Sequence, residues 1–249
     1  MPKLNEMRIQ KRLTTGFIIT TAITSIGAIL GIIALIFISN RYTYALQNYG
    51  FSQGDIGKAM IMFADTRSSP RGIISYDDAD LIASMAESYD TNKQKFENYW
   101  DTVHNTLTTS EEEAIYQSIN NLLTNYWTKE NEVIALSNTT DQAQKTQAQT
   151  VMNDTLAPMY EEIYSQMVNL LNINVDEGNA LDNKLNILGI IILAVIIIVV
   201  IISVIVSTKL GIIIAKGISE PLIALRNRLI TFEQGDLSTD FPVVDSQDE

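Results

Sequence analysis

Cysteine is absent from this sequence, and histidine occurs only once, at His104. Without cysteine the chain has no disulfide framework, no thiolate metal site and no cysteine redox chemistry. A Ser-His-Asp triad or a multi-histidine metal centre would depend entirely on His104, which lies near a predicted turn and is expected to be a solvated surface residue. We therefore predict that the protein is not an enzyme and has no metal site and no cofactor.

Basic residues are also scarce. The 249 residues include 17 Lys and Arg against 29 Asp and Glu, which gives a formal charge of -12. Nucleic acid is not an expected partner, because binding to phosphates requires a basic surface. The acidity is concentrated in residues 40–185, which hold 21 acidic and 9 basic residues. At long range this segment should repel anions and attract cationic or amine-bearing ligands.

Charge is missing altogether from two long apolar runs, residues 17–39 and 187–206. Each run is long enough to cross a hydrocarbon core of about 30 Å as a helix that rises about 1.5 Å per residue. A cleaved signal peptide is the alternative for the first run. However, the run exceeds the roughly 7 to 15 apolar residues of such peptides, and no small-x-small cleavage site follows it. We therefore predict transmembrane helices over residues 14–39 and 186–208.

Basic residues flank both runs on the sides nearer the chain termini. They are Lys3, Arg8, Lys11 and Arg12 before the first run, and Lys209, Lys216, Arg226 and Arg228 after the second. Basic residues close to membrane helices favour the cytoplasmic side. We therefore predict a multi-pass protein of the cell membrane, with residues 1–13 and 209–249 in the cytoplasm and residues 40–185 outside it.

The extracytoplasmic segment, residues 40–185, has the pattern of a helical domain. Its only prolines are Pro70 and Pro158, and strand-like alternation is absent. Three turn signals divide it into four helices. Four long helices joined by short loops form an up-down-up-down bundle. The predicted fold is therefore an all-α membrane protein with an extracytoplasmic four-helix bundle between two transmembrane helices.

The turn signals consist of helix caps and a break. At the first turn, Asp77 or Asp78 is expected to cap a helix that begins near residue 79. At the second turn, "TTSEEE" predicts a capping box in which Ser110 and Glu113 bond each other's backbone amides. The third turn is expected at residues 137–142.

The middle two helices allow a test of register. If their turn centres near Thr108, Trp100 lies opposite Tyr116 and Tyr89 lies opposite Trp127. Such aromatic pairs are expected to pack in the core and not to form a ligand site.

The fourth helix keeps an apolar seam and has no proline to separate it from the second apolar run. The seam residues are Leu156, Met159, Ile163, Met167 and Leu170. A bend at Gly178 is the alternative, although glycine weakens a helix by only about 1 kcal/mol. We therefore predict one continuous helix from the bundle into the membrane.

The C-terminal segment, residues 209–249, begins with a heptad seam suited to a parallel coiled coil. The seam residues are Ile218, Leu222, Leu225, Leu229 and Phe232. Pro221 stands near the start, where a helix tolerates proline, and Gly235 is placed as a C-terminal cap.

This segment resembles the first half of a HAMP linker. The resemblance rests on "I-S-x-P-L" from Ile218 to Leu222, "GDLS" from Gly235, apolar connector positions at Leu237, Phe241 and Val243, and the pair Asp248 and Glu249. It implies that a second HAMP helix and an output module lie beyond Glu249.

The whole layout resembles the N-terminal part of a methyl-accepting chemotaxis protein with a four-helix-bundle sensor domain. "LTTSEEEAIY" and "APMYEEI" in the outer segment agree with that family. The resemblance implies a homodimeric transmembrane chemoreceptor that controls a histidine kinase, with its coupling protein, through a cytoplasmic part. Two alternatives remain: the input half of a sensor histidine kinase or cyclase, and a membrane-anchored scaffolding bundle that senses nothing.

The resemblance also suggests where a ligand binds. Receptors of this kind that sense amino acids hold the ligand carboxylate with arginines on the first outer helix, at the dimer interface. Arg67 and Arg71 match that placement, with Gln149 and Thr150 as polar complements, and the ligand would be an amino or organic acid or a periplasmic-type binding protein. Pro70 and Gly72 could instead turn the segment into a loop, and the arginines could be merely solvated or ion-paired.

Small residues form a stripe on the first apolar run. They are Thr20, Thr24, Gly27, Gly31 and Ala34. Small residues allow close approach of helix backbones in lipid, so this stripe is the predicted transmembrane dimer face.

Overall fold

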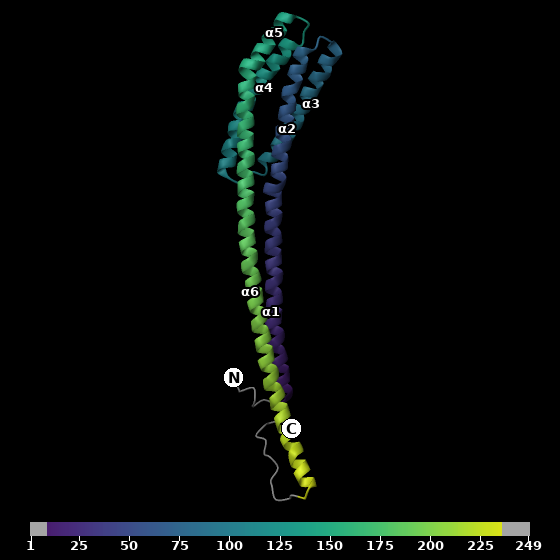
Figure 1. Cartoon of the computed structure of the whole chain (residues 1–249), viewed down its shortest axis with the longest axis vertical. Coiled ribbons are helices and arrows are strands. Elements are labelled where there is room, and N and C mark those ends of the chain that lie inside the picture. Colours follow the sequence, from purple (N-terminus) through teal and green to yellow (C-terminus); the bar gives the residue numbers. More distant parts are fainter. Residues whose placement is uncertain (1–8, 236–249) are drawn as a thin grey trace. The chain divides into compact units, whose positions relative to one another are not determined.

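The computed structural model describes residues 9–235, and every regular element in that range is helical. The all-α prediction is confirmed. In chain order the elements are α1 (Ile9–Ala45), the π-helix η2 (Leu46–Gly50), α2 (Phe51–Ser75), α3 (Ala79–His104), α4 (Ser110–Ser137), α5 (Gln142–Val151), the π-helix η3 (Met152–Leu156) and α6 (Ala157–Glu233) (Figure 1).

The chain divides into two compact units. The bundle unit is Asn40–Asn186, and the apolar unit consists of the described parts of Met1–Ser39 and Ile187–Glu249. Each unit has its own packing, and the long helices α1 and α6 contribute residues to both.

Four helices form the bundle unit. The first is the end of α1 with η2 and α2, the second and third are α3 and α4, and the fourth is α5 with η3 and the beginning of α6. The connections at residues 76–78, 105–109 and 138–141 are short, so consecutive helices run antiparallel (Figure 1).

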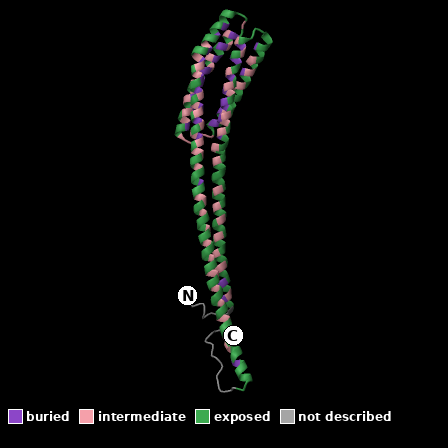
Figure 2. Cartoon of the chain, viewed as in Figure 1, coloured by how far each residue is buried: buried purple, intermediate pink, exposed green. Residues whose placement is uncertain are grey.

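Aromatic and aliphatic side chains fill the interior of the bundle. Buried residues line the inward faces of its helices (Figure 2). The predicted seam of the fourth helix is confirmed, because Leu156, Ile163, Met167 and Leu170 are buried and Met159 is partly buried. The largest fully buried side chains of the other helices include Ile56, Phe63, Phe96, Ile119 and Tyr126.

The caps follow the predicted turns with one correction. Asp78 caps α3, accepting from the amides of Asp80 and Leu81 at 2.9 and 3.1 Å. The capping box of α4 joins Thr109 and Glu112, so the predicted Ser110–Glu113 box was wrong by one residue. Three consecutive glutamates permit either register, and the bundle selects the one that buries Glu112 completely.

The corrected capping box predicts that the hydroxyl of Thr109 contributes more to the stability of the fold than that of its neighbour Ser110. Replacing Thr109 with alanine should lower the free energy of unfolding by about 1 kcal/mol, because the Glu112 amide loses its side-chain acceptor. The matched control is Ser110→Ala, whose effect should stay within about 0.5 kcal/mol. Denaturation followed by tryptophan fluorescence measures both, and a larger loss for Ser110→Ala would return the box to the predicted register.

Of the two aromatic pairs predicted between α3 and α4, the structure confirms one. Trp100 and Tyr116 stack with ring centroids 4.7 Å apart, as expected. The pairing of Tyr89 with Trp127 was wrong, because Trp127 packs against Phe63 and Phe96 at 5.7 and 5.6 Å. Phe63 comes from α2, so a register drawn from two helices alone could not place it.

Helix α2 continues through Pro70 to Ser75, so the segment is helical and not a loop. Gly72 lies where the helix meets α3, and a Cβ there would come within 3.0 Å of Met85 Sδ. Glycine at this position therefore permits close packing of α2 on α3.

Two helices of the described chain are long and apolar enough to cross a membrane, counted through the π turns as Gln10–Ser75 and Gln142–Glu233. In the apolar unit, α1 lies against α6, with the Gly27 Cβ position 3.2 Å from Val199 Cγ1. Large aliphatic side chains elsewhere on both helices are exposed, as lipid-facing residues would be.

Helix α6 is one continuous helix through Gly178 and Pro221, as predicted. The helix ends just before Gly235, which has a positive φ of 90° and donates to the Phe232 carbonyl. The predicted cap is confirmed. The connector positions Leu237, Phe241 and Val243, and the pair Asp248 and Glu249, lie outside the described residues.

Candidate functional site

Arg67 is positioned by α2 against the fourth helix of the bundle. Its guanidinium lies 4.2 Å from the centre of the Tyr160 ring, and Nη1 lies 3.3 Å from Glu161 Oε1. The Arg67 side chain is 25% exposed, whereas that of Glu161 is 67% exposed. Arg67 is therefore held on α6 by a cation–π contact and a surface ion pair.

Arg71, one turn later, is exposed. The structure records a contact to its backbone, from the Ser75 hydroxyl to the Arg71 carbonyl at 2.8 Å. Gln149 and Thr150 are exposed on α5, and no contact among the described residues joins them to either arginine. The ligand site at these four residues stays a prediction.

A buried glutamate, Glu130, lines the same small cavity as Arg67. Glu130 occupies the inward face of α4 and is 1% exposed. The Tyr126 hydroxyl donates to Glu130 Oε1 at 3.1 Å, and Oε2 has no hydrogen-bond partner among the described residues. A cavity of about 10 Å³ adjoins the carboxyl, and its lining comes from α2, α4, η3 and the start of α6: Arg67, Pro70, Tyr126, Glu130, Met152, Leu156 and Ala157.

Burial governs the titration of this acid. It raises the pKa of Glu130 to about 7, although hydrogen bonding to Tyr126 and Tyr89 and the charge of Lys93 act to lower it. Burial and the negative charge of Glu130 also raise the pKa of Tyr126 above its usual range. The acid can therefore gain and lose a proton near neutral pH while the tyrosine stays neutral.

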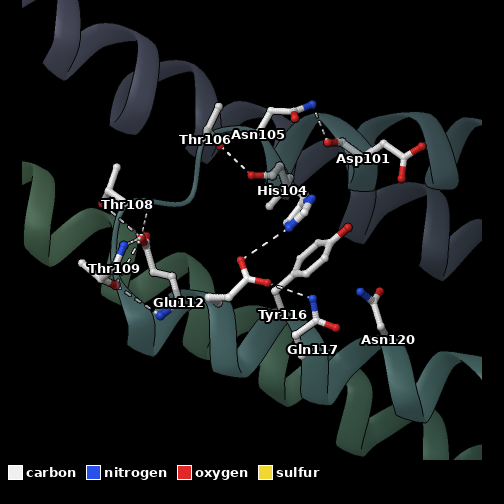
Figure 3. Close-up of polar contacts among 12 residues, drawn as sticks. Asp101, His104, Asn105, Thr106, Thr108, Thr109, Glu112, Tyr116, Gln117 and Asn120 are labelled. Carbon is white, nitrogen blue, oxygen red and sulfur yellow. Dashed lines mark hydrogen bonds and ion pairs between the residues drawn. The ribbon is translucent and has the colours of Figure 1, made fainter.

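The opposite end of the bundle holds a polar cluster around the α3–α4 turn, drawn in part in Figure 3. Glu112 is completely buried and accepts from the backbone amides of Thr108 and Thr109 at 2.8 and 3.1 Å. Asn174, from α6, is also completely buried and donates to Glu112 Oε1 at 3.2 Å. These contacts tie the turn to the fourth helix.

The π-helix η2 takes part in the same cluster. In η2 the Phe51 amide bonds the Leu46 carbonyl, five residues earlier, and Asn174 donates to the Asn48 carbonyl at 3.3 Å. Tyr49 Oη lies 3.2 Å from Thr108 Oγ1. Asn174 therefore links the first helix, the turn and the fourth helix through one side chain.

Further polar groups lie around this cluster. Thr108 also donates to Glu177 Oε2 at 3.2 Å. Burial is the largest cause that raises the pKa of Glu177, and the nearby charge of Glu112 raises it further. His104 is exposed, as expected, and stacks on Tyr116 (Figure 3). Its Nε2 lies 3.4 Å from Glu113 Oε2.

Lys145 ties the α2–α3 turn to the start of α5. The ammonium is almost fully buried and donates to the Tyr76 carbonyl and, at 2.7 Å, to Asp77 Oδ1. Asp77 is therefore the ion-pair partner of Lys145, while its neighbour Asp78 is the helix cap. Among residues 9–235, no group of acidic or histidine side chains could hold a metal ion.

The small-residue stripe of α1 faces α6 of the same chain at several positions. Thr24 and Gly27 line one apolar groove between the two helices, and Thr20 and Ala34 line two others. Gly31 has open space where a Cβ would project. A single chain does not test packing against a second copy, so the dimer face stays a prediction.

The heptad seam near the end of α6 is largely exposed. Leu222, Leu225, Leu229 and Phe232 are 44 to 59% exposed, and Ile218 and Pro221 are partly buried. Within the described residues the seam therefore has little apolar covering.

Comparison with known families agrees with this architecture. A family model described as a four helix bundle sensory module for signal transduction matches residues 6–188. No curated protein and no solved structure matches the chain. The matched domain is sensory and not catalytic, and it is typical of chemoreceptor sensor domains. The chain therefore belongs to the family of four-helix-bundle sensory modules for signal transduction.

Proposed function

We propose that the chain is the input part of a transmembrane chemoreceptor. The bundle unit would bind a small molecule outside the cell, and α6 would carry the signal through the membrane to a HAMP linker. The observation that carries the proposal is the continuity of α6, which includes bundle residues, the second apolar run and the exposed seam in one helix of 77 residues.

The contacts of α6 within the bundle support a mechanical role. Its side chains hold Arg67 through Tyr160 and Glu161, and Asn174 bonds both Glu112 and the Asn48 carbonyl. A displacement of α6 relative to the other helices must break or exchange these polar contacts. The signal would therefore consist of a change between two discrete hydrogen-bonded arrangements.

The exposed seam supports a homodimer as the working form. Apolar positions at heptad spacing are covered when a parallel partner helix packs on them, and a second copy supplies that helix with the same register. The histidine kinase and coupling protein would be engaged through the cytoplasmic output module expected after the HAMP linker.

Two measurements test this function. The full chain in lipid nanodiscs is screened by thermal shift against amino and organic acids, where a ligand at 100 times its dissociation constant should add about 2.7 kcal/mol of stability. The chain is then joined to the remaining HAMP helix and kinase-control region of a chemoreceptor. A stabilising ligand should change kinase activity in this chimera, and ligands that bind without changing it would contradict the relay.

The arginines give a mutational prediction. Replacing Arg67 with alanine should weaken binding of an anionic ligand about 10- to 100-fold, because a charge-assisted hydrogen bond of roughly 1.5 to 3 kcal/mol is lost. Lysine at this position should rescue binding only partly, since it cannot form the planar two-point contact. Calorimetric titration measures the change. Unchanged affinity in the Arg67→Ala, Arg71→Ala double variant would place the site elsewhere.

A further inference from the structure

We propose that Glu130 is a proton-binding site through which the bundle unit senses the acidity of its surroundings. This inference rests on the proposed function of the chain as a sensor, and it adds the proton as a stimulus with a site of its own. The site is the carboxyl of Glu130 with the small cavity beside it.

The position of Glu130 favours the neutral acid. It occurs four residues after Tyr126 and three before Val133, both of which are also buried in the core. A carboxylate removed from water needs a cation or several donors. Its closest donor is the Tyr126 hydroxyl, 3.1 Å from Oε1, with Tyr89 as a further hydroxyl, and Oε2 has no partner among residues 9–235.

The charged groups around Glu130 do not neutralise it. From α3, the Lys93 ammonium lies over the Trp127 ring, 5.2 Å from its centre, and its charge lowers the pKa of Glu130 by less than burial raises it. The Tyr89 hydroxyl, also from α3, lies 3.5 Å from Asn131 Oδ1 and weakly favours the carboxylate.

The remaining neighbours come from α2, η3 and α6. The Arg67 guanidinium is held on α6 by Tyr160 and Glu161. The cavity residues of η3 and α6 are uncharged: Met152, Leu156 and Ala157. Within residues 9–235 no ion pair to Glu130 opposes protonation, and a pKa of about 7 makes both forms accessible near neutral pH.

Loss of the proton would change the contacts of α6. A negative Glu130 attracts the Arg67 guanidinium, which lines the same cavity. Moving toward Glu130 takes that guanidinium away from Tyr160 and Glu161. The cavity also has room for about one water molecule, which can bond the exposed charge. Either response alters the wall formed by η3, where the fourth helix departs from α geometry.

The proton site can be observed directly. Infrared difference spectra of the full chain in nanodiscs, recorded across pH, should show one carboxyl that loses its proton near neutral pH. The same signal should remain in Glu132→Gln, a control on α4 whose side chain is 43% exposed, and should vanish in Glu130→Gln. Tyr126→Phe should move the midpoint to higher pH, because the carboxylate loses its donor.

These spectra also contain the results that would overturn the site. A wild-type midpoint near that of a free glutamate, about 4.3, would overturn it, as would survival of the signal in Glu130→Gln. If Glu130→Gln does not fold, the Tyr126→Phe variant provides the test instead. A carboxyl midpoint in Tyr126→Phe equal to that of wild type would then overturn the site.

Sensing is tested in the chimera with a kinase output. A step from about pH 6 to about pH 8 takes the acid from roughly nine-tenths to one-tenth protonated and should change kinase activity in wild type and Glu132→Gln but not in Glu130→Gln. Titration without any change in kinase activity would overturn proton sensing. If a small-molecule ligand still changes the kinase activity of the chimera, the proposed function stands. If neither the pH step nor a ligand changes kinase activity, the proposed function itself is contradicted.

Discussion

Replacing Glu112 with alanine should lower the free energy of unfolding of the bundle unit by roughly 3 to 5 kcal/mol. The buried carboxylate accepts from two backbone amides and from Asn174. Its removal leaves these donors without an acceptor, and each buried unsatisfied group costs about 1 to 3 kcal/mol. Denaturation followed by tryptophan fluorescence measures the change, because Trp100 and Trp127 both lie in the bundle unit.

The matched control is Glu113→Ala on the same turn of α4. The Glu113 side chain is 45% exposed, and its carboxylate contacts His104 and Gln117 at the surface. Its removal should change stability by no more than about 0.5 kcal/mol. Equal effects of the two substitutions would show that the buried cluster contributes little to the fold.

The stability of the bundle unit should fall as pH rises from about 4.5 to about 7. The folded state raises the pKa of Glu130 from 4.5 to about 7, so between these values the folded protein binds a proton that the unfolded chain has released. Stabilisation from this group is complete at low pH and is lost by the time pH exceeds the folded value. The loss is on the order of 3 kcal/mol.

The difference between wild type and Glu130→Gln isolates this effect, because glutamine does not titrate. Glu177, whose pKa is also raised, contributes a dependence of the same sign in both proteins. Tryptophan-detected denaturation across pH should therefore show a steeper decline for wild type and for Glu132→Gln than for Glu130→Gln. Parallel curves for all three proteins would mean that Glu130 does not change its proton occupancy on folding.

The sequence was sufficient to predict most of the fold, because the fold follows from periodicity and caps. The apolar seam of the fourth helix and a cap at Asp77 or Asp78 depend on residues within a few turns of one another; the structure confirms the seam and selects Asp78 as the cap. The aromatic layer around Trp127 was predicted wrongly because Phe63 joins it from a third helix. Contacts between helices that are distant in the sequence produce no recognisable pattern in the sequence of any one helix.

The candidate site could be predicted only in small part. Arg67 was singled out for its charge, but its contact with Tyr160 depends on the packing of α2 on α6. Glu130 and Asn174 were missed because polar residues are expected on the solvated face of a bundle helix. The available signal was spacing, since Asn174 follows Leu170 by four residues, in step with the buried seam.

Each of the two long helices that pass from one unit to the other contains one π turn, η2 or η3. A π turn accommodates one residue more than an α turn, so it has the form of a single-residue insertion absorbed by the helix. Deleting one residue from Leu46–Gly50 would let the helix close in α geometry, and because the wider turn had taken up that residue, the helix on either side would keep its phase. Both π turns lie within the bundle unit, so in evolution they mark two points where the chain could lose one residue and still present the same helix faces to the core.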